Sequence, residues 1–259
     1  MSKLLESLEE IGRMLAAPIQ RYLISDVESS RLAKLIDRTR GLLMRSYRLA
    51  VRMNHMCIIV TREIGHNNVF LSFNGGKDSV TVFHLYRLAA LTAAKELNKP
   101  STLPLNVVYF KEQGIREFAE IIDFMNRTAA KYNFTLQVIE GDWRSGIPKL
   151  PSSNKKAFIL GARNSDSDIQ QLSEIQEGVV DGVGFTRIHP IVDWSYGDVW
   201  NFIRLFSLEY CPLYDRGYTS IGSIDDTIAN PHLRNPDGSY SPAYTLKDWS
   251  LERCGRIMS

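Results

Sequence analysis

Hydrophobic and polar positions divide the chain into a helical first part and a longer part of alternating apolar runs and helical segments. In residues 1–65, leucine and isoleucine recur at three- and four-residue steps, as at Leu4, Leu8, Ile11 and Leu15. This spacing predicts amphipathic helix. We therefore expect an N-terminal helical arm over residues 1–65, packed on the core of a domain that spans residues 66–259.

The longer part alternates between two periodicities. Short apolar runs predict strands at residues 69–73, 105–110, 134–139, 157–160 and 186–192. The segments between and after them predict helices at 79–97, 118–132, 196–208 and, briefly, 244–257. Ser195 and Asp198 have the spacing of a capping box at the start of the third helix.

Strands that alternate with helices require crossover connections, which favour a parallel sheet. The predicted fold class is therefore α/β, a doubly wound, mostly parallel sheet with helices on both faces. Such sheets bind ligands beyond the carboxyl ends of their strands. Residues 71–79 and 161–166 both follow predicted strands, so we expect them to meet at a ligand site.

Composition narrows the class of protein. Of 259 residues, 44% are hydrophobic and 23% charged, and the net charge of +2 gives no bulk electrostatic reason to bind nucleic acid or a membrane. The three cysteines, Cys57, Cys211 and Cys254, are far apart and contain no C-x-x-C pair, which argues against a disulfide framework and a structural zinc site. No apolar run reaches the roughly 18 residues that span a bilayer, and the N-terminus resembles no targeting signal, so we expect a cytoplasmic protein.

The stretch L-S-F-N-G-G-K-D-S at residues 71–79 carries the clearest chemistry. It joins a strand to a helix, and a helix start after a glycine turn can hold phosphate on backbone amides. Gly75 and Gly76 lack Cβ atoms, so their amides can approach an anion closely. The spacing fits neither the Walker loop nor the G-x-G-x-x-G fingerprint. A glycine turn without a ligand is the alternative interpretation.

Five motifs, in order along the chain, carry a family resemblance. The loop is similar to the S-G-G-x-D-S pyrophosphate loop of enzymes that split ATP between the α and β phosphates. It is followed by G-A-R-N-S-D at 161–166, H-P-I-V-D-W-S-Y-G-D-V-W at 189–200, P-L-Y-D-R-G-Y-T-S-I-G at 212–222 and E-R-C-G-R at 252–256. Together they resemble the eukaryotic-type FAD synthases (FMN adenylyltransferases) of the phosphoadenylyl-sulfate reductase-like family. The resemblance implies an adenine nucleotide α-hydrolase-like fold.

The resemblance also implies a reaction, in which AMP passes from ATP to FMN to give FAD and pyrophosphate, with Mg²⁺ as cofactor. It assigns catalytic roles to Asn74, Asp78, Asp166, Arg253 and Arg256. It assigns ATP binding to Ser72, Phe73, Gly75, Gly76, Lys77, Ser79, Phe110, Gly161 and Arg163. It assigns FMN binding to Trp194, Tyr214, Tyr218, Arg253 and Arg256, with both tyrosines exposed.

For the metal, the first choice is Asp166 and the second is Asp78, although each could instead cap a helix. Trp194 could equally fill the core, and the arginines could be solvated surface residues. Whether Lys77 reaches phosphate cannot be read from the sequence. The expected partners are the small molecules ATP and FMN, without nucleic acid or membrane, for a monomer that contacts apo-flavoproteins transiently.

Two other functions stay open. A sulfonucleotide reductase of the same fold would need a nucleophilic cysteine near the C-terminus, in a setting such as E-C-G-x-H. Cys254 has arginine neighbours that can lower a thiol pKa, yet it lies between Arg253 and Gly255 and no histidine follows. A non-catalytic nucleotide or flavin sensor is the third hypothesis, but the loop and its carboxylates are intact.

Overall fold

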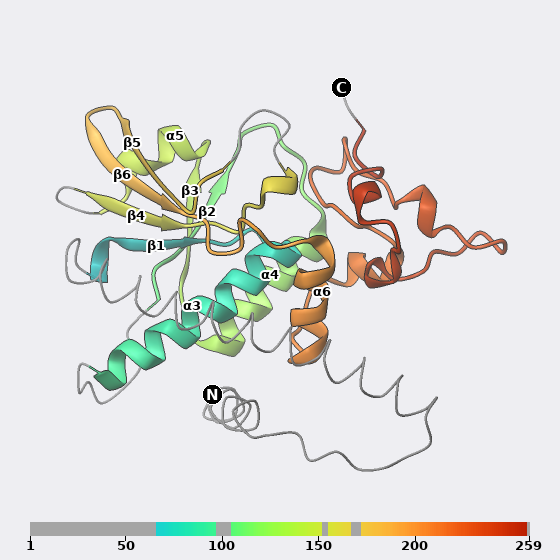
Figure 1. Ribbon diagram of the computed structural model, residues 1–259. Helices are drawn as coiled ribbons and strands as arrows, with labels where there is room; N and C mark the ends of the chain where they lie inside the picture. The colour runs from blue at the N-terminus through green and yellow to red at the C-terminus, as the bar shows by residue number, and fades with distance from the viewer. Residues whose placement is uncertain (1–65, 97–104, 152–154, 167–171, 258–259) are drawn as a thin grey trace, which may run out of the picture.

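A six-stranded sheet forms the centre of the computed structural model, which describes residues 66–96, 105–151, 155–166 and 172–257 (Figure 1). The strands are β1 (Val69–Ser72), β2 (Val107–Lys111), β3 (Leu136–Glu140), β4 (Lys156–Ile159), β5 (Ile175–Val180) and β6 (Val183–Ile188). The α-helices are α3 (Lys77–Glu96), α4 (Ala119–Tyr132), α5 (Trp143–Gly146) and α6 (Tyr196–Leu205). The arm predicted for residues 1–65 lies outside the described residues.

The strand order is β3-β2-β1-β4-β6-β5, and every neighbouring pair is parallel except β5 with β6. The mostly parallel, doubly wound sheet predicted from the sequence is therefore confirmed. The chain winds from β1 through β2 to β3 on one side, and β4 lies on the other side of β1. A crevice opens at the carboxyl ends of the strands where such a reversal occurs.

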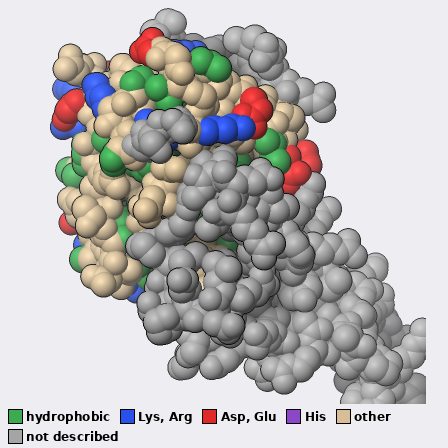
Figure 2. Space-filling model, turned by 90° about the vertical axis from the view of Figure 1, so that its left-hand side faces the viewer, with side chains coloured by type: hydrophobic (Ala, Val, Ile, Leu, Met, Phe, Trp, Pro, Cys, Tyr) green, Lys and Arg blue, Asp and Glu red, His purple; other side chains and the backbone are tan. Residues whose placement is uncertain are grey.

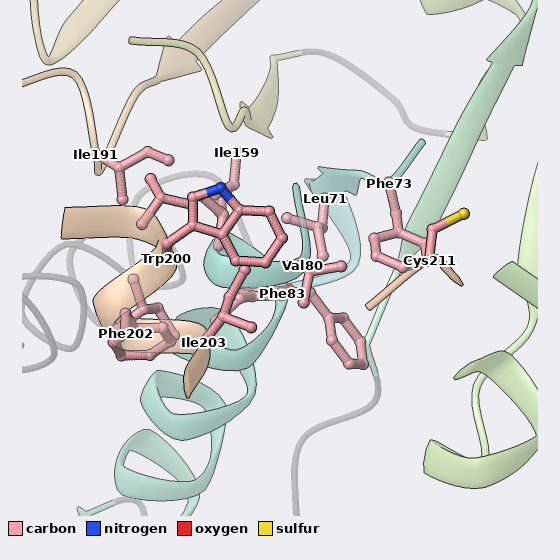
Figure 3. Packing of buried hydrophobic residues seen from close by; sticks show 14 of the residues in the cluster. Leu71, Phe73, Val80, Phe83, Ile159, Ile191, Trp200, Phe202, Ile203 and Cys211 are labelled. Carbon is pink, nitrogen blue, oxygen red and sulfur yellow. The ribbon is translucent and has the colours of Figure 1, made fainter. Parts of the chain in front are cut away.

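Alternating side chains of the strands build one core on each face of the sheet. On one face, residues of β1 and β4 pack against α3, α4 and α6. Figure 3 shows side chains of β1, β4, α3 and α6 converging in this core. This core includes Leu71, Val80, Phe83, Phe124, Ile159, Trp200 and Ile203. On the other face, the core consists of Phe70, Val108, Phe158, Phe185, Ile147 and Leu150. Ile147 and Leu150 directly follow α5, so helices cover both faces, although α5 is short.

The predicted capping box at the start of α6 is confirmed. Ser195 Oγ accepts from the Asp198 amide at 3.1 Å, and Asp198 Oδ2 accepts from the Ser195 amide at 3.1 Å. These two bonds satisfy amides that a helix start leaves without partners. They fix the direction in which α6 leaves the sheet.

Two predictions about secondary structure were wrong. Strand β5, the antiparallel edge strand, was not predicted, and the strand predicted at 186–192 lies earlier, as β6. The predicted helix at 244–257 is replaced by two 3₁₀ turns, Ala243–Thr245 and Trp249–Leu251. The second turn begins at Asp248, whose side chain accepts from the Ser250 amide and stabilises a turn rather than a longer helix.

The surface agrees with the small net charge of the chain. On the face seen in Figure 2, basic and acidic side chains lie close to one another rather than in separate patches. Among the helices in the described ranges, none is long and apolar enough to cross a membrane.

Candidate active site

A cavity of about 550 Å³ opens at the carboxyl ends of the central strands. Its walls come from the loop after β1, the end of β2, the start of α4, the face of β4 that packs under α5, and residues 221–256. Five residues assigned to the site from the sequence lie in its wall: Ser72, Asn74, Gly76, Phe110 and Arg256. The fold thus brings together candidate functional residues from near both ends of the described chain.

The loop after β1 turns directly into α3. Gly75 has a φ of +73°, in the left-handed region that favours glycine. The Gly76 amide donates to Asn74 Oδ1 at 3.1 Å, and the Lys77 amide donates to the Tyr214 hydroxyl at 2.8 Å. Two amides assigned to phosphate therefore have protein partners. The bond to Asn74 is local and exposed, so an incoming anion can replace it at little cost.

Two other loop residues lie behind the cavity wall. The side chain of Phe73 is fully buried and packs against Phe83 and Phe124, so the ATP contact predicted for Phe73 could come only from its backbone. Ser79 is also buried, and its hydroxyl donates to the Gly76 carbonyl at 2.9 Å. Both residues support the loop from within.

Gly161, in the loop after β4, lies directly on the first turn of α3. A Cβ atom at this position would lie 2.8 Å from the carbonyl carbon of Asp78 and 2.9 Å from the Ser79 amide nitrogen. Both neighbours are backbone atoms, which cannot move aside as the end of a flexible side chain can. The close approach explains a glycine here and brings Arg163 beside Asp78.

Four charged residues form a buried charge cluster next to this contact: Lys77, Asp78, Arg163 and Glu252. Lys77 Nζ lies 2.8 Å from Asp78 Oδ2 and 2.5 Å from Glu252 Oε1. Arg163 Nε lies 2.7 Å from Asp78 Oδ1, and Arg163 Nη2 lies 2.7 Å from Glu252 Oε1. Although burial opposes it, the charges of Asp78 and Glu252 raise the pKa of Lys77 above its usual value, so its ammonium stays charged.

The cluster bears on three assignments. Arg163 has no exposed surface and does not line the cavity, so its predicted phosphate contact stays a prediction that this geometry does not support. Lys77 is likewise held by carboxylates and lies outside the cavity wall. Both carboxylate oxygens of Asp78 are in ion pairs, and its metal-binding role stays a prediction.

The three aromatic residues assigned to the flavin do not line the cavity. Tyr214 was expected to be exposed, but it is buried against Trp200, and burial raises the pKa of its hydroxyl. Trp194 is half-buried and packs against Phe202. Tyr218 packs edge-on against Phe118, which does line the cavity, so Tyr218 supports the wall from behind.

Two C-terminal arginines, Arg253 and Arg256, were assigned to catalysis, and of these two described residues Arg256 lines the cavity. Its Nη2 donates to Asp226 Oδ2 at 2.7 Å. Burial by itself would raise the pKa of Asp226. A hydrogen bond from Thr227 and the charge of Arg256 outweigh burial and lower that pKa below its usual value. Arg253 is exposed and outside the wall.

Asp166 is the last residue of the 3₁₀ turn Asn164–Asp166, in the loop that also carries Gly161. This places its backbone after the end of β4, at the same edge of the sheet as the cavity. Its catalytic and metal-binding roles stay predictions. Elsewhere in the described ranges, no three histidine, cysteine or acidic side chains are grouped so that they could hold a metal ion.

Several residues of the cavity wall were missed by the sequence analysis. Arg187, on β6, places its guanidinium carbon 5.6 Å from the centre of the Trp143 ring. Glu112 and Glu117 line the opposite side, after β2, and burial followed by the charge of Glu140 raises the pKa of Glu117. No motif marks these positions. They could have been found only from the strand order, which places the ends of β2 and β6 at one edge of the sheet.

Known proteins resemble this chain in sequence and in fold. A family model for the phosphoadenosine phosphosulfate reductase domain matches residues 143–229. A Schizosaccharomyces pombe protein named as a probable FAD synthase is 40% identical over 192 residues, which cover 72% of this chain and 70% of that protein. The chain belongs to the FAD synthase family.

A further named relative and a solved structure are also similar to this chain. A probable FAD synthase of Caenorhabditis elegans is 34% identical over 195 residues, and the match covers 73% of this chain but only 36% of that longer protein. The crystal structure of Candida glabrata FMN adenylyltransferase in complex with FAD and inorganic pyrophosphate superposes with a TM-score of 0.74. The match covers 97% of this chain and 95% of the C. glabrata chain at 19% identity, and it supports the predicted fold class.

Proposed function

We propose that this protein is an FAD synthase, which transfers AMP from ATP to FMN and releases pyrophosphate. The observation that carries the proposal is one cavity that joins the loop after β1 to Arg256, at the edge of the sheet where a doubly wound fold binds its ligand. Membership of the FAD synthase family supports it. The S. pombe relative bears that name, and the C. glabrata structure holds FAD and pyrophosphate.

The cavity offers distinct surfaces for the parts of the two substrates. Ser72, Asn74 and Gly76 lie just before the N-terminus of α3, where the helix dipole favours the pyrophosphate part of ATP. Phe110 and Phe158 lie on an apolar side that suits adenine, and we place the base against the end of β2. The FMN phosphate then faces Arg256, whose guanidinium matches phosphate oxygens.

The reaction needs positioning more than proton transfer. A phosphate monoester loses its second proton near pH 6, so the FMN phosphate is mostly a dianion at neutral pH. Its oxygen forms a bond to the α-phosphorus, and the bond from the α-phosphorus to the bridging oxygen of pyrophosphate breaks. No general base is required. The protein must hold two anions in line and offset their repulsion.

The charges in the cavity wall make a bound cation useful. Two arginines, Arg187 and Arg256, face three carboxylates, Glu112, Glu117 and Asp226, so the described wall has no excess of positive charge. Mg²⁺ on the ATP phosphates would supply that charge, because magnesium binds phosphate oxygens with one or two carboxylates. Both oxygens of Asp78 are already in ion pairs, which favours the first choice from the sequence, Asp166. We therefore assign the metal to Asp166.

Three wider features complete the proposal. The catalytic unit is residues 66–259. The protein acts as a monomer in the cytoplasm and hands FAD to apo-flavoproteins through transient contacts. Trp194, Tyr214 and Arg253, which lie outside the cavity wall, would meet substrate only if the wall rearranged, so we give them no role in the reaction.

The match of residues 143–229 to the phosphoadenosine phosphosulfate reductase domain supports a second candidate, a sulfonucleotide reductase. That match ends before Cys254, which is exposed and lies outside the cavity wall. The other described cysteine, Cys211, is buried, and burial raises the pKa of its thiol to about 11. Neither thiol is placed to attack a ligand in the cavity, so the adenylyl transfer is favoured.

One assay separates the candidates. Purified protein is mixed with ATP, FMN and Mg²⁺, and FAD is sought by chromatography, while a parallel sample with a sulfonucleotide and a thiol donor is tested for sulfite. We expect FAD and no sulfite. Sulfite without FAD would indicate the reductase, and binding of ATP or FMN without either product would indicate a sensor.

A further inference from the structure

Glu252 joins three segments that are far apart in the sequence, yet it does not line the cavity. Its Oε1 accepts from Lys77 Nζ at 2.5 Å, at the first residue of α3. Both of its oxygens accept from Arg163 Nη2, at 2.7 and 2.9 Å, in the loop after β4. Its side chain is only 8% exposed. Its contacts are therefore with protein and not with solvent or a ligand in the cavity.

The backbone around Glu252 is tied to the segment that shapes the cavity wall. The Glu252 carbonyl accepts from Thr219 Oγ1 at 2.6 Å. Asn230 Nδ2 donates to Thr219 Oγ1 and to the Leu251 carbonyl, each at 2.8 Å. Four residues after Glu252, Arg256 forms an isolated β-bridge with Thr227. Glu252 and Arg256 thus belong to one short segment that is bonded at both ends to the segment that shapes the cavity wall.

The buried charge cluster is formally neutral, because the charges of Lys77 and Arg163 equal those of Asp78 and Glu252. Removing Glu252 alone would leave one buried positive charge without compensation, which is strongly unfavourable. Removing Lys77 at the same time would restore neutrality. The effects of substituting Glu252 and Lys77 should therefore not add. This non-additivity distinguishes the pair from a residue that contacts phosphate directly.

We propose that Glu252 is a positioning residue for the adenylyl transfer: through Lys77 and Arg163 it holds the C-terminal segment, and with it Arg256, against the phosphate loop. The inference rests on the proposed function. It also assigns Lys77 and Arg163 to this clamp and not to contact with phosphate. The pairing of Gly161 with the first turn of α3 places Arg163 where the clamp needs it.

The test is a double-mutant cycle on FAD formation with Glu252→Gln, Lys77→Met and the two combined. Because a displacement of about 1 Å at a reacting group costs on the order of 100-fold in rate, we expect each single variant to lose about 10- to 100-fold in kcat. The KM for ATP should change by less than about threefold. The double variant should be no slower than the slower single variant, because the buried charge is again balanced.

A direct phosphate contact by Lys77 predicts the opposite pattern. Lys77→Met would then raise the KM for ATP, and the losses in the double variant would multiply. That result would overturn the proposal. The matched control is Glu209→Gln, which removes one charge from an exposed ion pair with Lys131 at 2.7 Å. It should keep kcat within about twofold, as surface pairs contribute little.

A further variant and a second measurement cover the case in which Glu252→Gln does not fold. Thr219→Val removes the hydroxyl that donates to the Glu252 carbonyl and changes no charge, so it should lower kcat with KM for ATP unchanged. Hydrogen exchange of residues 219–257 should be faster in Thr219→Val and Glu252→Gln, while that of β2 and β3 stays as in the wild type. Unchanged exchange would contradict the clamp. Wild-type protein that forms no FAD would instead refute the proposed function, and exchange would still decide whether Glu252 holds the segment.

Discussion

Arg256 donates from Nη2 to Asp226 Oδ2 at 2.7 Å, so a carboxylate holds the guanidinium at the wall of the cavity. The guanidinium packs directly on Gly222, where a Cβ atom would displace it. The arginine is therefore positioned before any ligand arrives. A group held in place in this way can stabilise developing charge without reorganisation during the reaction.

Substitution of Arg256 should reduce turnover and leave the protein folded. We expect Arg256→Ala to lower kcat by about 10²- to 10³-fold, as loss of one preorganised donor does elsewhere. The measurement is the rate of FAD formation, with circular dichroism as the check on folding. Arg127→Ala, which removes an exposed arginine of α4 paired with Asp123, is the control and should keep the wild-type rate. A near-normal rate in Arg256→Ala would remove Arg256 from the site.

Gly161→Ala should disturb the contact between the loop after β4 and α3. The added Cβ atom would lie within 3.0 Å of backbone atoms of Asp78 and Ser79, and such overpacking costs about 1–3 kcal/mol. We expect a lower free energy of unfolding in urea and slower FAD formation. Gly184→Ala is the matched control, because its nearest neighbour in the described chain is Lys155 Cγ at 4.0 Å. Equal stability of the two variants would argue against the close contact.

His84 should make the stability of the protein depend on pH. It is buried on α3, and burial, followed by the charges of Arg87 and Lys131, lowers its pKa to about 3. In the unfolded chain the pKa is about 6.5, so below pH 6.5 the unfolded state binds the extra proton. The stability that comes from keeping His84 neutral in the folded state is therefore fully present above pH 6.5. Below pH 6.5 the free energy of unfolding falls by up to about 1.4 kcal/mol per pH unit.

The measurement is urea unfolding at pH 7.5, 6.5 and 5.5. We expect the midpoint of the wild type to fall more steeply over this range than that of His84→Gln, which cannot bind the proton. His232→Gln, at an exposed position, should retain the wild-type slope. Parallel curves for the wild type and His84→Gln would contradict a buried, neutral His84.

The two carboxylates once assigned to the metal should respond differently to Mg²⁺. Asp166→Asn should raise the Mg²⁺ concentration that gives half-maximal FAD formation, because it removes the carboxylate that we assign to the metal. Asp78→Asn should leave that concentration unchanged and lower the free energy of unfolding, because it removes one charge from the buried charge cluster. A shift in the Mg²⁺ dependence with Asp78→Asn alone would reverse the assignment.

Much of the sheet could be predicted because its inner strands are nearly continuous apolar runs. Strand β5 (I-Q-E-G-V-V) escaped because it has neither a continuous apolar run nor a regular apolar–polar alternation, as an exposed edge strand can. Its turn into β6 was nevertheless readable in principle. Asp181 and Gly182 both have positive φ values, as a two-residue hairpin turn requires, and Asp-Gly is a strong hairpin signal. The C-terminal turns escaped because side-chain caps, and not periodicity, determine them.

The site was predictable where the backbone alone decides it. Gly76 lies in the loop after β1 and Phe110 lies near the carboxyl end of β2, and a doubly wound sheet brings strand ends together. The positions of Lys77 and Arg163 were not predictable, because their partner Glu252 lies 175 and 89 residues away in the sequence. The burial of Tyr214 was not predictable for a similar reason. Its hydroxyl accepts from the Lys77 amide, a bond between residues 137 positions apart.

The most direct test of the proposed function follows the phosphates of ATP. The protein is incubated with FMN, Mg²⁺ and ATP labelled at either the α or the γ phosphate, and the products are separated. We expect the α label in FAD and the γ label in pyrophosphate, in equal amounts. An α label that never enters FAD, or a γ label released as single phosphate, would contradict the transfer of AMP to FMN.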